Sequence, residues 1–119
     1  VVVGLASAGA RTTICARRPD QAREVAALGA DVGAWPPAPG SWDVLVNCTP
    51  LGGVSAPGES PLPGGPFDGR LVYDLIYRPP ETPLLAAAKA AGCATINGWP
   101  MLRAQAGKQF EWWTKPLCV

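Results

Sequence analysis

Short apolar runs alternate with helical patterns along almost the whole chain, and this alternation constrains the fold more than any other feature. Strand-like runs span residues 12–16, 31–34, 43–48, 71–77 and 94–96. Helical spacing of apolar residues spans 19–28, 82–91 and 100–114, and each of these segments opens beside a proline. Short buried strands that alternate with helices favour a mainly parallel sheet with helices on both faces. The sequence therefore predicts an α/β fold.

The beginning and the middle of the chain are less regular. Val1–Leu5 is apolar from its first residue and leads to Gly9, which is typical of the end of a helix that begins upstream. Residues 49–69 are rich in Gly and Pro and predict a long irregular loop, a feature that is usually functional in a compact domain. We expect residues 1–119 to form one α/β domain, truncated at its N-terminus, with no second domain.

Composition excludes several classes of function. With 48% hydrophobic residues and a formal net charge of +1, the chain can bury a core but has no basic excess for a nucleic acid or a membrane surface. Histidine is absent, so we expect neither a metal site nor a Ser-His-Asp triad. The cysteines are widely spaced and form no CxxC pair, which predicts reduced, buried thiols in a cytoplasmic protein; they are Cys15, Cys48, Cys93 and Cys118.

Candidate site residues follow the predicted strands, because ligands bind beyond the carboxyl ends of parallel strands. They are Arg17–Arg18, Thr49–Pro50, Tyr77–Arg78 and Asn97–Gly98. No GxGxxG motif occurs between a strand and a helix. A dinucleotide-binding fold would therefore have its glycine turn upstream of Val1, and an α/β domain that binds no nucleotide stays open at this point.

Arg17 and Arg18 come directly after the first strand, where NAD-binding domains carry an acidic residue for the ribose 2′-hydroxyl. Guanidinium groups are suited instead to the 2′-phosphate of NADP, and each charge-assisted hydrogen bond contributes about 1.5–3 kcal/mol. The pair thus predicts a preference for NADP over NAD. The alternative interpretation is a pair of solvated surface arginines.

Five motifs occur in a fixed order and cover nearly the whole chain. They are Ala16-Arg17-Arg18-Pro19, Val46-Asn47-Cys48-Thr49-Pro50-Leu51-Gly52, Tyr73-Asp74-Leu75-Ile76-Tyr77-Arg78-Pro79 with Thr82-Pro83-Leu84-Leu85, Asn97-Gly98-Trp99-Pro100-Met101-Leu102 with Gln105-Ala106, and Phe110-Glu111-Trp112-Trp113-Thr114. Together they resemble the C-terminal, NADP-binding part of the shikimate dehydrogenase family.

The resemblance implies a Rossmann-like fold, NADP as the cofactor, and a role for each matching residue. Ala16, Arg17 and Arg18 would hold the 2′-phosphate, and Thr49 would lie against the cofactor. The main chain at Leu75 and Gly98 would meet the nicotinamide, with Met101 packing nearby. Glycine suits position 98 because a residue without a Cβ lets the backbone approach a ring closely. Tyr77 and Gln105 would hydrogen-bond the substrate.

Some of these residues also have a structural interpretation. Tyr73 and Tyr77, four apart on one predicted strand, share a face and would both serve as packing aromatics. Gln105 would be a solvated helix residue, and Asp74 a hydrogen-bond acceptor in mid-strand. Trp112 and Trp113 are expected in a core or between domains.

The chain also departs from the family pattern. Ala16 and Arg18 stand where Asn and Thr are usual, and Pro100 stands where glycine is common. Family members use a Lys–Asp pair on an N-terminal substrate domain to move the proton. None of the three lysines, Lys89, Lys108 and Lys115, matches that motif. We therefore expect no catalytic residue in this chain and no turnover by the chain alone.

The resemblance points to an oxidoreductase that interconverts shikimate and 3-dehydroshikimate with NADP in aromatic amino-acid (chorismate) biosynthesis. Its partner would be this small-molecule substrate, with no nucleic acid and no membrane; the sequence leaves the oligomeric state open. Two alternatives remain: a quinate/shikimate dehydrogenase of broader specificity, and a non-catalytic Rossmann-like binding module.

Overall fold

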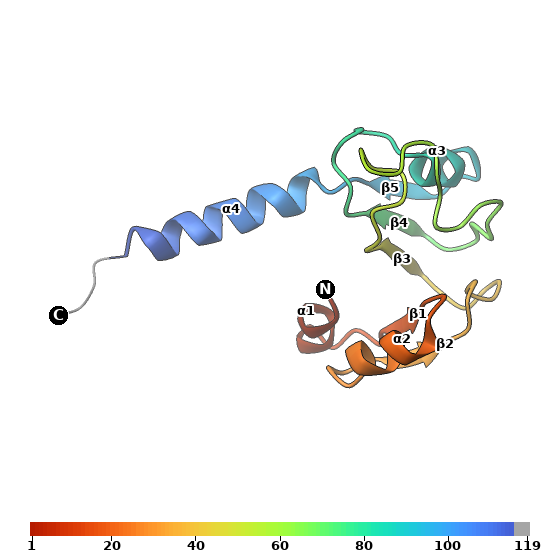
Figure 1. Cartoon of the computed structure of the whole chain (residues 1–119), viewed down its shortest axis with the longest axis horizontal. Helices are drawn as coiled ribbons and strands as arrows, with labels where there is room; N and C mark the ends of the chain where they lie inside the picture. Colours follow the sequence, from red (N-terminus) through yellow and green to blue (C-terminus); the bar gives the residue numbers. More distant parts are fainter. Residues whose placement is uncertain (116–119) are drawn as a thin grey trace. The chain divides into compact units, whose positions relative to one another are not determined.

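The computed structural model describes residues 1–115, which contain five strands and four helices (Figure 1). The chain divides into two compact units, Val1–Ser41 and Trp42–Val119. The boundary directly follows a Pro- and Gly-rich stretch at residues 36–40. All strand pairs are parallel, which confirms the α/β prediction, and the strands form two sheets, one in each unit.

The first unit contains a two-stranded sheet. Its elements are α1 (Val2–Ser7), β1 (Thr13–Cys15), α2 (Pro19–Ala26) and β2 (Asp31–Gly33). The two strands pair in parallel, with α2 packed against both of them. Gly9 ends the opening helix at a φ of 77°, a left-handed conformation that favours glycine, as the sequence predicts.

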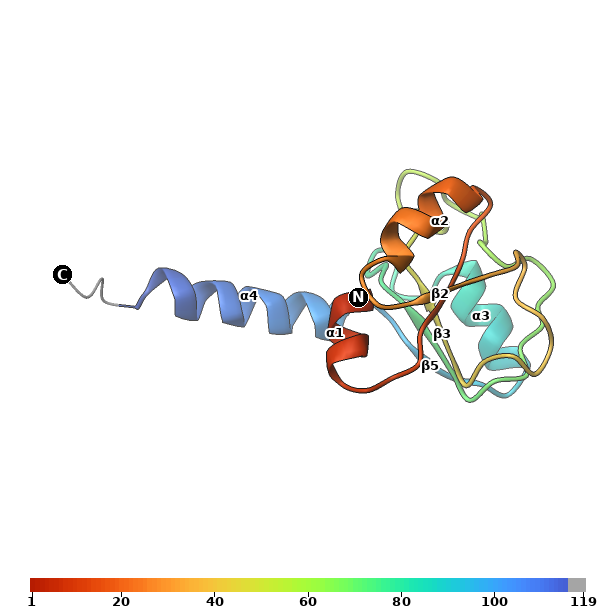
Figure 2. The same ribbon diagram turned by 90° about the horizontal axis from the view of Figure 1, so that it is seen from below.

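The second unit contains the three-stranded sheet and two helices. Its elements are β3 (Val44–Asn47), β4 (Leu71–Asp74), α3 (Pro83–Ala90), β5 (Ala94–Ile96) and α4 (Trp99–Trp113). The strand order is β3-β4-β5, and α3 packs against β4 and β5 (Figures 1 and 2). Thr82 caps α3 and Gly92 follows its end at a φ of 91°, so the predicted start and stop signals are both confirmed.

A small apolar core lies between α3 and its sheet. The fully buried Val72 and Leu84 join the two elements, and the loop before β4 adds a further leucine; the cluster is Leu62, Val72, Leu84, Leu85, Ala88 and Cys93. Burial at about 25 cal/mol per Å² of apolar surface makes this cluster the main source of stability in the second unit.

One predicted strand is longer than the observed one. The run 71–77 is extended in sequence, but β4 ends at Asp74 because its neighbours end there. Asn47 is the last residue of β3 and pairs with Asp74, while Ile96 is the last residue of β5 and pairs with Tyr73. Tyr77 is therefore not on the strand, and the prediction that it shares a strand face with Tyr73 is wrong.

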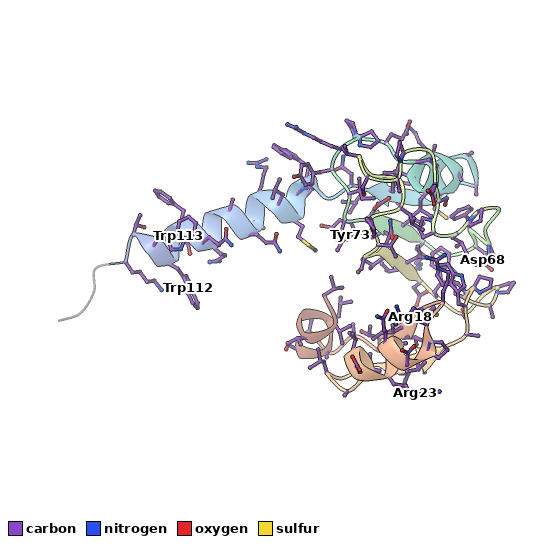
Figure 3. All side chains as sticks on the ribbon, viewed as in Figure 1. Arg18, Arg23, Asp68, Tyr73, Trp112 and Trp113 are labelled. Atoms are coloured by element: carbon purple, nitrogen blue, oxygen red, sulfur yellow. The ribbon has the colours of Figure 1, made fainter. Side chains whose placement is uncertain are left out.

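The last helix, α4, buries no side chain completely. Phe110, Trp112 and Trp113 are exposed, and both tryptophans project from the C-terminal end of α4 in Figure 3. The expectation that these tryptophans lie in a core is wrong for this chain, because nothing in residues 1–115 covers them. No helix in the described residues is long and apolar enough to cross a membrane.

Candidate functional site

The carboxyl ends of β3, β4 and β5 meet at one edge of the sheet in the second unit. Parallel pairing aligns Asn47 with Asp74, and Tyr73 with Ile96. The segments that leave this edge carry Thr49, Leu75 and Gly98, which the sequence predicts to bind the cofactor. The register therefore brings these three segments to one edge, the usual position of a ligand in such sheets.

The segment after β3 is folded into a tight turn by Asn47. The Asn47 Oδ1 accepts hydrogen bonds from the Thr49 amide at 2.9 Å and from the Thr49 hydroxyl at 2.7 Å. The same hydroxyl accepts a bond from the Leu51 amide at 3.3 Å. Asn47 is only 3% exposed whereas Thr49 is exposed, so a buried amide holds a surface residue at the edge.

The segment after β4 is fixed by the buried carboxylate of Asp74, which is 0% exposed. Its Oδ1 accepts from the Asn47 side-chain nitrogen at 3.0 Å and from the Ile76 amide at 3.1 Å. Its Oδ2 accepts from the Thr82 hydroxyl at 2.6 Å, and that hydroxyl accepts from the Leu85 amide at 3.3 Å. The predicted role of Asp74 as a structural acceptor is confirmed, although the residue ends the strand rather than lying within it.

The segment after β5 crosses directly against the segment after β4. The Gly98 amide donates to the Ile76 carbonyl at 2.9 Å. A Cβ atom at Gly98 would lie 2.5 Å from the carbonyl carbon of Leu75 and closer still to its oxygen. Leu75 and Gly98 are thus brought together as the shared prediction for them requires. The need for glycine arises from contact with Leu75 within the chain, which differs from the predicted reason of approach to a cofactor ring.

The two predicted substrate residues occupy different elements. Tyr77 lies beyond the end of β4 and its ring contacts Trp99, with centroids 6.3 Å apart and planes at 48°. Gln105 and Met101 lie on α4, where Gln105 is exposed and Met101 is half-buried. Sequence reasoning missed the contact between Tyr77 and Trp99, because it depends on where β4 ends.

The start of α4 is fixed by Asn97, another residue of the edge. The Asn97 Oδ1 accepts from the Trp99 amide at 3.1 Å, and its Nδ2 donates to the Pro80 carbonyl at 3.0 Å. The same asparagine thereby holds the entry to α4 and the chain just before α3. The Asn-Gly pair of the fourth motif is therefore a local structural device as well as a site signature.

The first unit carries the predicted phosphate-binding residues. Ala16 is half-buried at the end of β1, and Arg17 and Arg18 follow it with exposed side chains. Arg18 lies 3.7 Å from the Asp20 carboxylate, and both side chains are 68% exposed (Figure 3 labels Arg18). Arg17 makes no ion pair with any residue between 1 and 115. Asp20 thus partly neutralises Arg18 and leaves Arg17 as the freer cation.

The three described cysteines, Cys15, Cys48 and Cys93, are free thiols. Cys93 is buried as expected, but Cys48 is exposed because β3 ends one residue before it, so the prediction of burial is wrong there. Although the residue as a whole is exposed, partial desolvation of its thiol raises the pKa of Cys48, and the nearby Asp74 carboxylate also acts to raise it. Cys118 lies outside the described residues. Within residues 1–115 no group of three or more acidic or cysteine side chains could hold a metal ion.

Comparison with known proteins adds an independent line of evidence. No protein-family model matches the chain. It is 38% identical over 124 residues to the shikimate dehydrogenase (NADP(+)) of Methanocella arvoryzae, an alignment that covers 96% of this chain and 45% of that protein. Curated relatives under the same name are 38–53% identical, and the chain spans 26–45% of their length.

Two solved structures share the fold. The shikimate 5-dehydrogenase of Thermus thermophilus, in complex with NADP(H) and shikimate, superimposes with a TM-score of 0.85 at 35% identity, covering 98% of this chain and 45% of that one. The ligand-free 5-ketofructose reductase of a Gluconobacter species gives a TM-score of 0.79 at 32% identity, covering 97% and 46%. The chain therefore belongs to the shikimate dehydrogenase family and matches the C-terminal part of its members.

Proposed function

We propose that the two units together form the NADP-binding domain of an oxidoreductase that interconverts shikimate and 3-dehydroshikimate. The observation that carries this proposal is the meeting of the segments bearing Thr49, Leu75 and Gly98 at one sheet edge. These are the positions that the family resemblance assigns to the nicotinamide half of the cofactor. The edge belongs to the second unit, so the proposed binding of the nicotinamide half depends on that unit alone.

The donors present in the chain fit NADP. Arg17 is exposed and free of ion pairs among residues 1–115, and no carboxylate occupies the end of β1 itself to repel a 2′-phosphate. Guanidinium groups match phosphate oxygens in geometry and charge. When bound, NADP supplies the chemistry of accepting or donating a hydride.

The chain's own contribution is to hold and orient the reactants. Thr49 and the backbone at Leu75 and Gly98 would fix the nicotinamide half, with Met101 packing nearby. Tyr77 and Gln105 would hydrogen-bond the hydroxyls or the carboxylate of the substrate. The Trp99 ring beside Tyr77 would limit the movement of the whole tyrosine side chain about its Cα–Cβ bond and so hold its hydroxyl in one place.

The described lysines do not supply the proton-transfer group of this proposal. Lys89 pairs with Glu81 at 3.5 Å and Lys108 with Glu111 at 3.0 Å, all on exposed helix or loop surfaces, and Lys115 is exposed just after α4. We therefore propose that residues 1–119 provide cofactor binding and part of the substrate contact, without turnover by themselves. The proposal places the activity in the cytoplasm, in agreement with the free thiols of Cys15, Cys48 and Cys93.

A chimera tests the proposal with an activity readout. In it, residues 1–119 replace the matching region of the Methanocella arvoryzae enzyme, and NADP reduction is followed with shikimate as substrate. We expect NADP-dependent turnover by the chimera and none by residues 1–119 alone. A folded chimera that binds neither NADP nor shikimate would refute the proposal and favour a non-catalytic binding module.

A second candidate is a dehydrogenase of broader specificity, acting on quinate or on another hydroxyketone pair. The likeness to 5-ketofructose reductase favours it, because a similar fold there serves a different substrate. The same chimera, assayed with quinate and with 5-ketofructose, separates the two candidates. Turnover of shikimate alone supports the first candidate, and turnover of several substrates supports the second.

A further inference from the structure

We propose that Asp74 is a positioning residue that sets the nicotinamide end of the cofactor site through hydrogen bonds behind the sheet edge. The inference rests on the proposed function, since it concerns how that site is held in shape. Asp74 touches neither substrate nor cofactor in this proposal. It acts through Asn47 and Ile76, which in turn hold Thr49 and Gly98.

The first step is the position of the carboxylate. Asp74 is 0% exposed, and three donors from three separate segments face its two oxygens. An ionised carboxylate accepts and never donates, so it satisfies all three at once. A neutral amide in its place would direct two hydrogens at one of these donors. A carboxylate therefore satisfies all three donors, whereas an amide can satisfy only two of them.

The second step links Asp74 to Thr49. The Asn47 side-chain nitrogen faces the Asp74 carboxylate at 3.0 Å, which fixes the amide so that its oxygen faces Thr49. That oxygen then accepts from both the amide and the hydroxyl of Thr49. Without Asp74, the Asn47 nitrogen keeps only its longer bond to the Leu51 carbonyl at 3.4 Å, so the turn that carries Thr49 loses the shorter of the two contacts that orient this amide.

The third step links Asp74 to Gly98. The Asp74 Oδ1 holds the Ile76 amide at 3.1 Å, which bends the chain out of β4 directly after the last paired residue. The carbonyl of Ile76 then accepts from the Gly98 amide at 2.9 Å. One oxygen of Asp74 therefore positions both main-chain segments that the proposal places against the nicotinamide, while the other oxygen anchors Thr82 and α3.

The test compares two ligands on the full 119-residue chain. By the proposed function NADP has a 2′-phosphate for Arg17 and Arg18 and a nicotinamide for the sheet edge, whereas adenosine 2′,5′-bisphosphate lacks the nicotinamide half and has partners only in the two arginines. Asp74→Ala removes both oxygens. We expect it to weaken NADP binding about 10-fold, measured by calorimetry, because buried donors lose their partner. Binding of adenosine 2′,5′-bisphosphate should stay within about 2-fold, since hydrogen-bond losses at Asp74 do not reach the first unit.

Two further variants separate positioning from general stability. Asp74→Asn can keep its oxygen toward Asn47 and Ile76 and turn its nitrogen to Thr82. It should therefore retain most of the NADP affinity that Asp74→Ala loses. Val72→Ala, at a fully buried position on the same strand, lowers stability without touching this network. We expect it to lower the melting temperature and to leave the ratio of the two affinities unchanged.

Each outcome decides the matter. The inference would be overturned if Asp74→Ala left the ratio of NADP affinity to adenosine 2′,5′-bisphosphate affinity unchanged, or if Val72→Ala changed that ratio equally. The proposed function would remain intact in both cases. Failure of the unmodified chain to bind either ligand would overturn the proposed function, and this inference with it. If Asp74→Ala does not melt cooperatively, Asn47→Ala removes the bonds to Thr49, Leu51 and Asp74 but leaves those of Asp74 to Ile76 and Thr82, and it must still lower the ratio.

Discussion

The place that a Cβ atom would take on Gly98 lies 2.5 Å from the carbonyl carbon of Leu75. Gly98 has an ordinary φ of −72°, so space rather than backbone conformation requires the glycine. The two segments that leave β4 and β5 therefore touch main chain to main chain. This contact fixes how far apart the ends of the two strands can lie.

Gly98→Ala is expected to destabilise the second unit. The added methyl would meet backbone atoms on the segment after β4, which cannot move aside as a flexible side chain could, so we expect a loss of about 1–3 kcal/mol or more in the free energy of unfolding. Urea unfolding followed by circular dichroism measures it. Gly107→Ala is the matched control, because a methyl there meets nothing within 4 Å and lies in α4. The control should gain stability by up to about 1 kcal/mol. An equal response of the two variants would contradict the argument.

The strand-end residues could be predicted from the sequence because they depend only on alternation. Once strands and helices alternate, Thr49 and Gly98 fall near the carboxyl ends of parallel strands, whatever the details of packing. Leu75 lies inside the predicted strand 71–77, so its assignment came only from the family resemblance. Arg17 and Arg18 were placed by the same reasoning, and both follow β1 as expected. This part of the site needs no knowledge of the register.

The hydrogen-bond network could not be predicted, because it depends on register. Asn47 and Asp74 are 27 residues apart, and only the pairing of β3 with β4 sets them opposite each other. The prediction that Tyr77 lies on the strand was wrong for a related reason. The apolar pattern continues past Asp74, but neither neighbouring strand extends beyond it, and the Asp74 side chain binds the Ile76 amide where a strand partner would have stood.

The thiol of Cys48 offers a pH-dependent probe of the site. Partial burial, and then the Asp74 charge, raise its pKa above the ordinary cysteine value. A raised pKa means less thiolate at a given pH, and the thiolate is the reactive form. We expect iodoacetamide to alkylate Cys48 more slowly than a free cysteine peptide at about pH 8, with the rate still rising above the pH at which the peptide levels off. Mass spectrometry of the peptide that contains Cys48 measures the rate.

Saturating NADP should slow this alkylation further, because Cys48 is the neighbour of Thr49 in the proposed site. Cys93 serves as the internal reference, since it is buried and its sulfur donates to the Gly69 carbonyl at 3.3 Å. Its alkylation should be slower than that of Cys48 and unaffected by NADP. Faster reaction of Cys48 than of the free peptide would show that the local environment stabilises the thiolate.

Hydrogen exchange should distinguish the two units. Ala22 is the one fully buried hydrophobic side chain in residues 1–41, all of which the structure describes, whereas Val72 and Leu84 lie in the six-residue cluster of the second unit. Local stability follows buried apolar contacts. We therefore expect the amides of β4 and α3 to exchange at least about 10-fold more slowly than those of β1 and α2, a difference of about 1.4 kcal/mol. Equal protection would mean that the first unit is stabilised by contacts other than its own core.

Arg17 is expected to carry most of the preference for NADP. Arg18 lies 3.7 Å from Asp20, and although such an exposed pair is weak, the carboxylate competes with a phosphate for the same guanidinium. Arg17 has no such competitor among the described residues. Arg17→Gln should therefore weaken NADP binding by about 1–2 kcal/mol, Arg18→Gln by less, and the double variant by about 1.5–4 kcal/mol.

The selectivity of these losses decides the role of the pair. NAD binding should change little, because NAD has no 2′-phosphate, and the NADP loss should shrink at high salt because exposed charge pairs are screened. Arg23→Gln is the matched control, an exposed arginine in the last turn of α2, the helix that follows Arg17 and Arg18. Titration of each variant with NADP and with NAD by calorimetry gives both affinities. Equal losses for the two cofactors would mean that the arginines bind the shared pyrophosphate or support the fold. No loss for either cofactor would make them ordinary surface charges, so only a loss confined to NADP supports the role assigned to Arg17.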